Sequence, residues 1–362
     1  MTNVTRKSRP RIKPRFPARR NARRRPAYAA LDLGTNNCRL LVAEPAGRGF
    51  RVVDAFSRIV RLGEGLERRR RLSAAAIART IDALKVCASK MRRRRVVSAR
   101  NVATEACRRA ENCDSFLARV RAEAGLEIEI ISAEEEAELA LAGCAPLFDA
   151  GYSHGLVFDI GGGSTELMWV RRDGAGSAPG LIASASLPFG VVNLSETHGL
   201  SETHGLSETH GRDRMPREAY EAMIARLATH LEAFDARHRI RRRIGAGSVQ
   251  MLGTSGTVTT LAAIHLGLPG YDRSAVDGSY LGVDDIEAVN RKLLGMDHRE
   301  RMAEPCVGPA RADFVLAGCA ILETILRTWP VARLRVADRG VREGILLRLM
   351  RDARPGLRAT GS

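Results

Sequence analysis

Three turns of small and polar residues interrupt the apolar segments of the chain, and their composition suits the binding of phosphate groups. Glycine lets a ligand approach the backbone closely, Ser and Thr add hydroxyl donors, and consecutive N–H groups form an anion-binding concavity. One such turn would indicate little more than a tight loop, but three predict a phosphate chain held from two sides. The candidate phosphate-binding residues are Gly34, Thr35, Asn36 and Asn37; Gly161, Gly162, Gly163, Ser164 and Thr165; and Gly253, Thr254, Ser255, Gly256 and Thr257. None of the turns matches GxxxxGK[ST] or GxGxxG, which excludes the standard nucleotide-binding fingerprints.

Acidic residues stand beside two of these turns. Asp32 and Asp159 each end an apolar segment directly before a turn, and Glu166 directly follows the second turn. Carboxylates next to phosphate oxygens could hold Mg²⁺ or another divalent cation. Asp32 taken alone could equally be a turn-forming residue. The repeated placement favours metal binding by Asp32, Asp159 and Glu166.

A further acidic cluster lies at residues 134–136, after Ser132. The segment Ser-Ala-Glu-Glu has the pattern of a helix capping box. Negative side chains in the first turn of a helix are stabilised by the helix dipole. This structural role would explain most of the cluster without any catalytic one.

The apolar spacing predicts two similar groups of three short strands, each followed by helices. The first group covers residues 28–33, 39–44 and 50–56, and the second covers 155–159, 167–171 and 181–187. Such a repeated strand–turn–strand–turn–strand unit predicts an α/β protein made of two related lobes. The other predicted strands are 96–103, 127–131, 250–252 and 334–337, and the predicted helices are 73–91, 114–123, one from residue 132, 216–234, one after 257, 311–329 and 341–350.

Five segments in this order resemble the exopolyphosphatase/guanosine pentaphosphate phosphohydrolase (Ppx/GppA) family. They are residues 30–39, 103–108, 130–137, 158–167 and 253–257, and the segment FDIGGGSTEL at 158–167 is the most specific. Arg311-Ala-Asp and 341–345 also fit late motifs of the family. The resemblance implies duplicated actin/hexokinase/Hsp70-like (ribonuclease H-like) lobes around a central cleft, a metal-dependent enzyme with Mg²⁺ as the expected ion, and a homodimer.

The resemblance also implies roles for individual residues. Glu136 corresponds to the catalytic base that activates water, and Arg108 corresponds to a phosphate-binding arginine. Asp159 and Glu166 correspond to residues needed for activity and metal binding. The expected reaction is processive hydrolysis of the terminal phosphoanhydride of inorganic polyphosphate, and the alternative substrate is the 5′ γ-phosphate of guanosine pentaphosphate.

The sequence departs from the family pattern in several places. The first turn reads Thr35-Asn36-Asn37 where Ser-Asn-Ser is commoner, and the hexapeptide LSETHG occurs three times at 194–211. Identical copies favour a flexible insertion over a histidine metal site. The chain stops at residue 362, so a short form without the C-terminal HD-like domain is expected. The expected organisation is an arm at 1–27, a first lobe at 28–146, a second lobe at 147–332, a strand and helix at 333–350 that pack back on the first lobe, and a tail at 351–362.

Charge is concentrated at the N-terminus. Residues 1–27 contain eleven basic and no acidic side chains, out of a net charge of +17 for the 362 residues. This arm could contact a polyanion, or it could be a solvated tail, a start codon assigned too early, or an organellar transit peptide. The basic runs at 68–71, 92–95 and 241–243 are most simply solvated surface.

The overall composition excludes several classes of protein. Hydrophobic residues make up 44% and charged residues 27%, which is typical of a globular protein rather than a disordered or coiled-coil one. No apolar run reaches 18 residues, so no membrane span is expected. Seven cysteines without a CxxC pair suit a reducing cytosol.

Two other functions are compatible with parts of the sequence. A sugar or acetate kinase of the same fold would need an adenosine pocket and an acceptor site, and no motif indicates either. A nucleic-acid-binding protein could use the basic arm, but the core contains no recognisable reader helix, zinc finger or RNA-recognition sequence.

Overall fold

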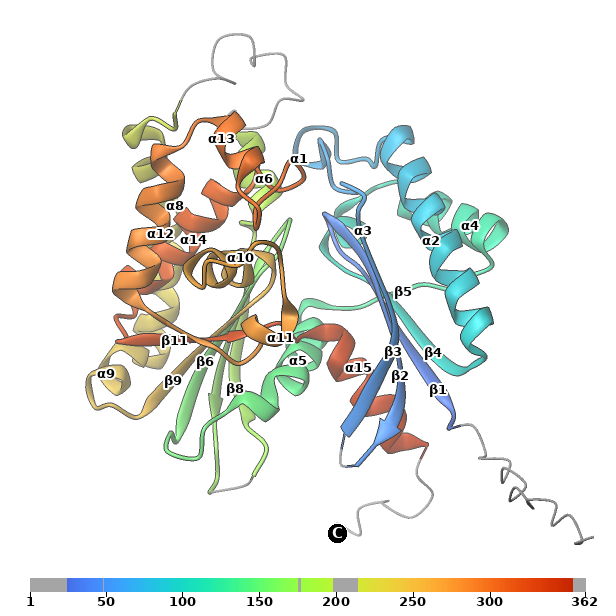
Figure 1. Ribbon diagram of the computed structural model, residues 1–362, viewed down its shortest axis with the longest axis horizontal. Coiled ribbons are helices and arrows are strands. Elements are labelled where there is room, and N and C mark those ends of the chain that lie inside the picture. The colour runs from blue at the N-terminus through green and yellow to red at the C-terminus, as the bar shows by residue number, and fades with distance from the viewer. Residues whose placement is uncertain (1–24, 48, 175–176, 198–213, 354–362) are drawn as a thin grey trace, which may run out of the picture.

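The computed structural model describes residues 25–47, 49–174, 177–197 and 214–353 of the chain (Figure 1). Almost all of the predicted arm, most of the hexapeptide repeat and most of the C-terminal tail lie outside these residues. Within them the seven cysteines are free and buried. None of the described helices is long and apolar enough to cross a membrane.

The first lobe is built on a five-stranded sheet in the order β3-β2-β1-β4-β5. β1, β2 and β3 are antiparallel to one another, whereas β4 is parallel to β1, and β5 is parallel to β4. The three antiparallel strands are those predicted from the apolar spacing. The strands are β1 (Ala27–Leu33), β2 (Asn37–Ala46), β3 (Gly49–Ile59), β4 (Val96–Ala103) and β5 (Glu129–Ile130).

The second lobe is built on a six-stranded sheet in the order β10-β11-β9-β6-β7-β8. β6, β7 and β8 are antiparallel, and β9 and β11 follow in parallel. The order of the first sheet therefore recurs, with β10 added at the edge. The strands are β6 (His154–Ile160), β7 (Thr165–Arg171), β8 (Gly180–Leu187), β9 (Val249–Thr254), β10 (Tyr280–Gly282) and β11 (Arg333–Ala337).

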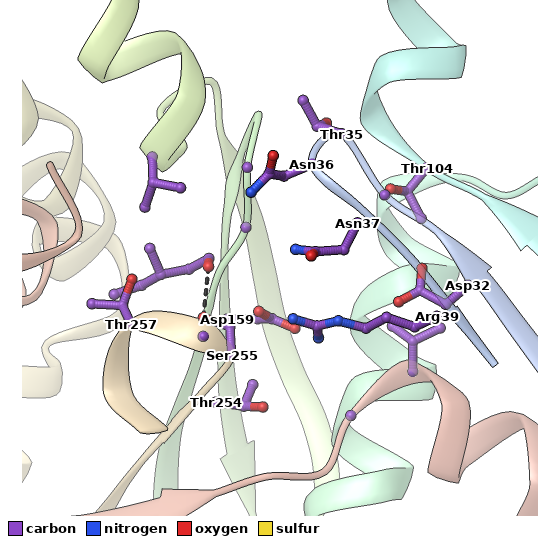
Figure 2. A pocket seen from close by; sticks show the side chains of 18 of the residues that line it. Asp32, Thr35, Asn36, Asn37, Arg39, Thr104, Asp159, Thr254, Ser255 and Thr257 are labelled. Carbon is purple, nitrogen blue, oxygen red and sulfur yellow. Dashed lines mark hydrogen bonds between the residues drawn. The ribbon is translucent and has the colours of Figure 1, made fainter. Parts of the chain in front are cut away.

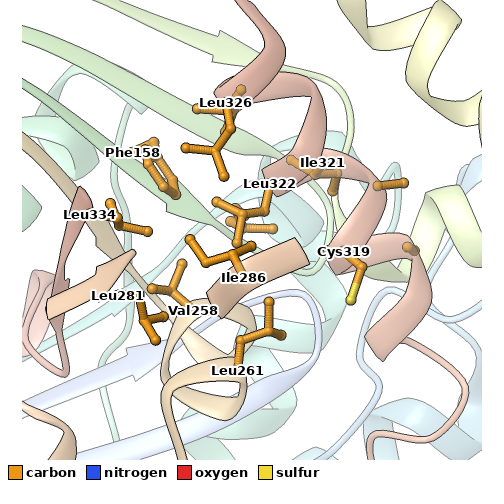
Figure 3. Packing of buried hydrophobic residues seen from close by; sticks show 14 of the residues in the cluster. Phe158, Val258, Leu261, Leu281, Ile286, Cys319, Ile321, Leu322, Leu326 and Leu334 are labelled. Carbon is orange, nitrogen blue, oxygen red and sulfur yellow. The ribbon is translucent and has the colours of Figure 1, made fainter. Parts of the chain in front are cut away.

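Helices cover each sheet, and the described residues form three hydrophobic cores: one in each lobe and a third between the lobes. In the first lobe α2 packs on α4, and in the second α14 packs on α8 and α12. Figure 3 shows the second core, where Phe158 of β6 meets Leu322 and Leu326 of α14. The first-lobe helices are α1 (Leu66–Arg69), α2 (Ala74–Arg94), α3 (Glu105–Arg109) and α4 (Cys113–Ala124). The second-lobe helices are η1 (Ala145–Leu147), α6 (Val191–Thr197), α8 (Arg217–His238), α9 (Ile240–Gly245), α10 (Gly256–His265), α11 (Arg273–Val276), α12 (Val283–Gly295), α13 (His298–Ala303) and α14 (Val315–Thr328).

Two helices pack against each other between the lobes: α5 (Ala133–Cys144) and α15 (Val341–Asp352). Their backbones approach closely, because a Cβ on Gly143 would stand 2.2 Å from the carbonyl oxygen of Gly340. α5 begins as the capping-box pattern predicts, since the Ser132 hydroxyl accepts a hydrogen bond from the Glu135 N–H. α5 carries Glu136 in its first turn, so the helix crossing positions a predicted catalytic residue.

Several boundaries differ from those that the sequence predicts. α14 begins at Val315 rather than at 311, and the amphipathic helix α12 was not predicted. α6 contains the first four residues of the first LSETHG copy, with Leu194 and Ser195 buried, so these four residues form a helix rather than a loop. Residues 333–350 divide between the lobes, because β11 joins the second sheet while α15 contacts β1 and β2. α15 also continues to Asp352, beyond the expected start of the tail at 351.

Candidate active site

A cavity of about 140 Å³ lies between the lobes, and all three predicted turns contribute to its lining. In Figure 2, Asn36 and Asn37 point from the first lobe towards Asp159, Ser255 and Thr257 of the second. Of the fourteen predicted phosphate-binding residues, twelve line the cavity. Thr165 and Gly253 are the two that do not.

The first two turns touch each other across the cleft. The first turn is closed by a hydrogen bond from the Gly34 N–H to the Asn37 carbonyl (2.9 Å). A Cβ on Gly162 of the second turn would lie 3.0 Å from the Asn36 Cβ, a spacing tighter than nearly all natural contacts. The glycine at 162 therefore allows the two turns to form one continuous wall.

The second turn connects β6 and β7 and leads into buried structure. The Gly161 N–H donates to the Ser164 carbonyl (2.9 Å). The Thr165 hydroxyl turns away from the cavity and donates to the Phe189 carbonyl at 2.6 Å. Thr165 thus stabilises the turn from behind, which explains its absence from the cavity lining.

The third turn joins β9 to the N-terminus of α10. Ser255 has a φ of +88°, a conformation that few non-glycine residues adopt. Its hydroxyl donates to the Ile160 carbonyl at 2.6 Å, the bond drawn in Figure 2. This bond joins the third turn to the end of β6 beside Asp159. Backbone strain of this kind is typical of functional sites.

Glu136 lines the cavity and is paired with Arg108. The Arg108 Nη1 donates to the Glu136 Oε2 at 2.9 Å, and the Glu136 side chain is 14% exposed. Burial raises the pKa of Glu136 well above its ordinary value, and the neighbouring Glu166 charge adds to this effect, while Arg108 opposes it. A raised pKa makes a carboxylate a stronger proton acceptor.

Arg108 does not line the cavity, although the resemblance implies that it binds phosphate. Its guanidinium donates to Glu105, to the Ile131 carbonyl and to Glu136. Burial alone would lower the pKa of Arg108, but Glu136 and Glu105 together raise it. The structure therefore places Arg108 behind Glu136, where its charge orients that carboxylate.

Asp32 and Asp159 face the cavity from opposite lobes (Figure 2). Among the described residues, neither side-chain carboxylate accepts a hydrogen bond or forms an ion pair. Burial raises the pKa of Asp32, and burial raises that of Asp159 to about 6. Two half-buried carboxylates without a protein donor fit Mg²⁺, which commonly takes one or two carboxylates and completes its coordination with water and substrate phosphates.

Glu166 differs from the two aspartates because its carboxylate is already satisfied. Its Oε1 accepts hydrogen bonds from the Ser164 and Ser186 hydroxyls at 2.6 and 3.0 Å. Burial, and then the Asp159 charge, raise the pKa of Glu166 to about 7. Over the described residues, no three His, Cys, Asp or Glu side chains form a metal-binding cluster. The predicted three-carboxylate site is therefore not brought together.

Basic side chains in the cavity were missed by the sequence prediction. Arg39 lies directly opposite Asp32 in the β1–β2 register, just as Glu166 lies opposite Asp159 in the β6–β7 register. The common spacing of seven residues would have located Arg39 once the two repeats were aligned. Three further arginines line the cavity: Arg311, Arg339 and Arg342. Arg311 and Arg342 lie in the late motifs 311–313 and 341–345, to which the sequence prediction gave no role, and no motif includes Arg339.

Comparisons with known proteins agree with this architecture. A model of the Ppx/GppA phosphatase family matches residues 41–353. "Exopolyphosphatase 2" of Mycobacterium tuberculosis is 31% identical over 335 residues, covering 89% of this chain and 98% of the relative. The crystal structure of the Aquifex aeolicus Ppx/GppA family member is 27% identical, with a TM-score of 0.68, and the match covers 91% of this chain and 99% of that one. A Cytophaga hutchinsonii exopolyphosphatase shares the fold at 22% identity, with a TM-score of 0.77 and coverage of 91% and 99%.

Proposed function

Since the chain belongs to the Ppx/GppA phosphatase family and is a hydrolase of phosphoanhydride bonds, we propose that it is an exopolyphosphatase. In this proposal it removes orthophosphate, one unit at a time, from the end of inorganic polyphosphate. One observation carries the proposal: the three phosphate-type turns and Glu136 line a single cavity between the lobes. Each turn offers backbone N–H and hydroxyl donors to an anion, so three turns around one cavity suit a ligand with several linked phosphate groups.

The proposed reaction is the in-line attack of water on the terminal phosphorus. Glu136 accepts the proton of the attacking water, and Arg108 holds its carboxylate in place through the 2.9 Å ion pair. The turn N–H groups stabilise negative charge on the transferring phosphoryl group without having to reorganise. Because phosphoryl transfer requires little covalent chemistry from the protein, positioning and charge stabilisation supply most of the rate enhancement.

A divalent cation is part of this proposal. Asp32 and Asp159 are the residues that would hold it, because both line the cavity and both lack a donor among the described residues. When bound, Mg²⁺ would neutralise charge on the phosphate oxygens. Glu166 supports the site from β7, where Ser164 and Ser186 fix its carboxylate.

A substrate panel tests the proposed function. Orthophosphate release would be measured from long-chain polyphosphate, tripolyphosphate and guanosine pentaphosphate, each with Mg²⁺ and with a chelator. We expect release from long-chain polyphosphate without accumulation of intermediate lengths, and loss of release in the chelator. Faster hydrolysis of guanosine pentaphosphate would assign the alternative substrate. No orthophosphate from any of the three would contradict the proposal.

Three further expectations go with this function. The basic residues of segment 1–27 would contact the polyphosphate chain outside the cleft, and binding would then weaken with salt. A cytoplasmic location is expected from the cysteine usage, and a homodimer is expected from the family resemblance. Deleting residues 2–24 and comparing the affinity for long chains at two salt concentrations would test the contact.

A further inference from the structure

The loop that follows β3 is bound to the first turn of the cavity. The Val60 N–H donates to the Asn36 carbonyl at 2.8 Å, and the Gly63 N–H donates to the Thr35 carbonyl at 2.9 Å. Arg79 of α2 holds the other side of the loop by donating to the Val60 carbonyl. The loop and the turn therefore move as one unit, since their backbones share hydrogen bonds.

Arg61 in this loop reaches across to the second lobe. Its Nη2 lies 3.1 Å from the Asp313 Oδ2, and its guanidinium stands 5.3 Å from the ring centroid of Phe314. The Arg61 side chain is 28% exposed and that of Asp313 is 7% exposed. An ion pair with one buried partner is less screened by solvent than a surface pair. The Arg61–Asp313 ion pair therefore holds the two lobes together more strongly than a fully exposed ion pair would.

Asp313 is fixed on its other side by His298. The His298 Nε2 donates to the Asp313 Oδ1 at 2.8 Å, and both side chains are buried. Asp313 directly precedes Phe314 and Val315, which line the cavity. A change at this carboxylate is thus transmitted to the cavity wall by the adjacent backbone.

A second contact between the lobes lies in the same region. The Gly65 N–H donates to the Glu196 Oε1 of α6 at 2.9 Å. In Figure 1, α1 and α6 lie at the top of the view, where the two lobes meet, whereas α5 and α15 cross lower down. The Arg61 contact and the Gly65 contact therefore bridge the lobes at the end of the cleft away from the helix crossing.

We propose that Arg61, Asp313 and His298 form an interlobe latch that holds the first phosphate turn against the second lobe. The three are positioning residues, because they act on the cavity through Asn36 and Phe314. The inference rests on the proposed function only in treating the cavity as the phosphate site. Losing the latch lowers the fraction of molecules with a closed cleft, and apparent affinity falls by that same fraction.

The variant Arg61→Met tests the latch, because it keeps an unbranched apolar stem and removes the charged guanidinium. We expect the KM for polyphosphate to rise by roughly tenfold, a typical coupling between two such states, while kcat changes by less than about twofold. Asp313→Asn should have the same effect, and the double variant should be no worse than the more affected single one. Arg61→Lys, which keeps the charge, should recover part of the affinity.

A matched control removes an ion pair far from the cleft. Arg327 binds Glu221 and Glu323 within the second lobe, so Arg327→Met should leave KM unchanged. Small-angle scattering of the substrate-free protein gives a readout independent of activity. Arg61→Met should have a larger radius of gyration than the wild type, and excess tripolyphosphate with Mg²⁺ should remove the difference.

Two results would overturn the latch. One is an unchanged KM and an unchanged radius of gyration in Arg61→Met. The other is a loss of kcat at constant KM, which would assign Arg61 to the chemical step instead. Should the wild type hydrolyse no phosphoanhydride, the proposed function would fail, but the scattering comparison would still decide whether the latch holds the lobes together.

Discussion

Arg108 and Glu136 form an ion pair with 2.9 Å between Nη1 and Oε2, and this pair joins α3 to the first turn of α5. Arg108 also binds Glu105 and the Ile131 carbonyl, so the arginine has little freedom to move. The carboxylate of Glu136 faces the cavity while its cationic partner stands behind it. An arginine in this place is held where it can orient the proposed base.

Replacing Glu136 tests the proposed base. Glu136→Gln keeps the shape of the side chain and cannot accept a proton, so kcat on polyphosphate should fall by roughly 10²- to 10⁴-fold. Glu134→Gln is the matched control, since Glu134 lies in the same helical turn but is exposed. The assignment would be contradicted if the initial rates of Glu136→Gln and Glu134→Gln differed by less than about twofold.

Replacing Arg108 separates positioning from phosphate binding. Arg108→Lys keeps the charge but loses the several fixed donors of the guanidinium. We expect kcat to fall by about 10- to 100-fold with little change in KM, because a small displacement of the Glu136 carboxylate from the attacking water slows the reaction without affecting substrate binding. A large rise in KM at constant kcat would show instead that Arg108 binds substrate, as the family resemblance implies.

Substituting Gly143 tests the crossing of α5 and α15. A Cβ at this position would stand 2.2 Å from the Gly340 carbonyl oxygen, so Gly143→Ala must push the two helices apart. Overpacking of this kind costs about 1 to 3 kcal/mol of the free energy of unfolding. Activity should fall as well, because α5 carries Glu136. Gly245→Ala is the control, since nothing lies within 4 Å of its Cβ; equal stability of the two variants would be inconsistent with the tight crossing.

The pKa of Glu166 predicts how stability varies with pH when metal is removed by a chelator. Burial raises this pKa from 4.5 to about 7, so between these values the folded protein retains a proton that the unfolded chain has lost. The free energy of unfolding should therefore decrease as pH rises through this window. In Glu166→Gln the decrease should be smaller by about 1 to 3 kcal/mol. Denaturant titrations at pH 5 and at about pH 7.5 measure the difference, and equal decreases in the two proteins would refute the raised pKa.

Local sequence patterns predicted much of the site. The capping box at Ser132 correctly marked the start of α5, because the cap depends on residues within one helical turn. The small-residue turns were found for a similar reason, since glycine and hydroxyl residues determine turn geometry by themselves. Thr165 and Gly253 were assigned with their neighbours, but the Thr165 hydroxyl turns to the Phe189 carbonyl and the Gly253 backbone packs against the Phe158 ring. Both partners are distant in the sequence.

The arginines illustrate what sequence spacing cannot resolve. Arg61 and Asp313 are 252 residues apart and form an ion pair only when the lobes meet. Three other arginines line the cavity from late segments of the chain. Arg311 precedes α14, Arg339 lies between β11 and α15, and Arg342 lies in the first turn of α15. In a chain with 58 basic residues, the late motifs mark the segments of Arg311 and Arg342 but do not show where their side chains point.

The amino-acid sequence by itself determined the duplicated strand units, the three turns and the acidic residues beside them, because hydrophobic period and turn chemistry act over a few residues. Only the tertiary structure decided that Arg108 lies behind Glu136, that Glu166 is satisfied by two serines, and that the lobes are bridged at Asp313. These relationships depend on burial and on the direction of side chains across a cleft. Both arise only when segments far apart in the chain are packed together.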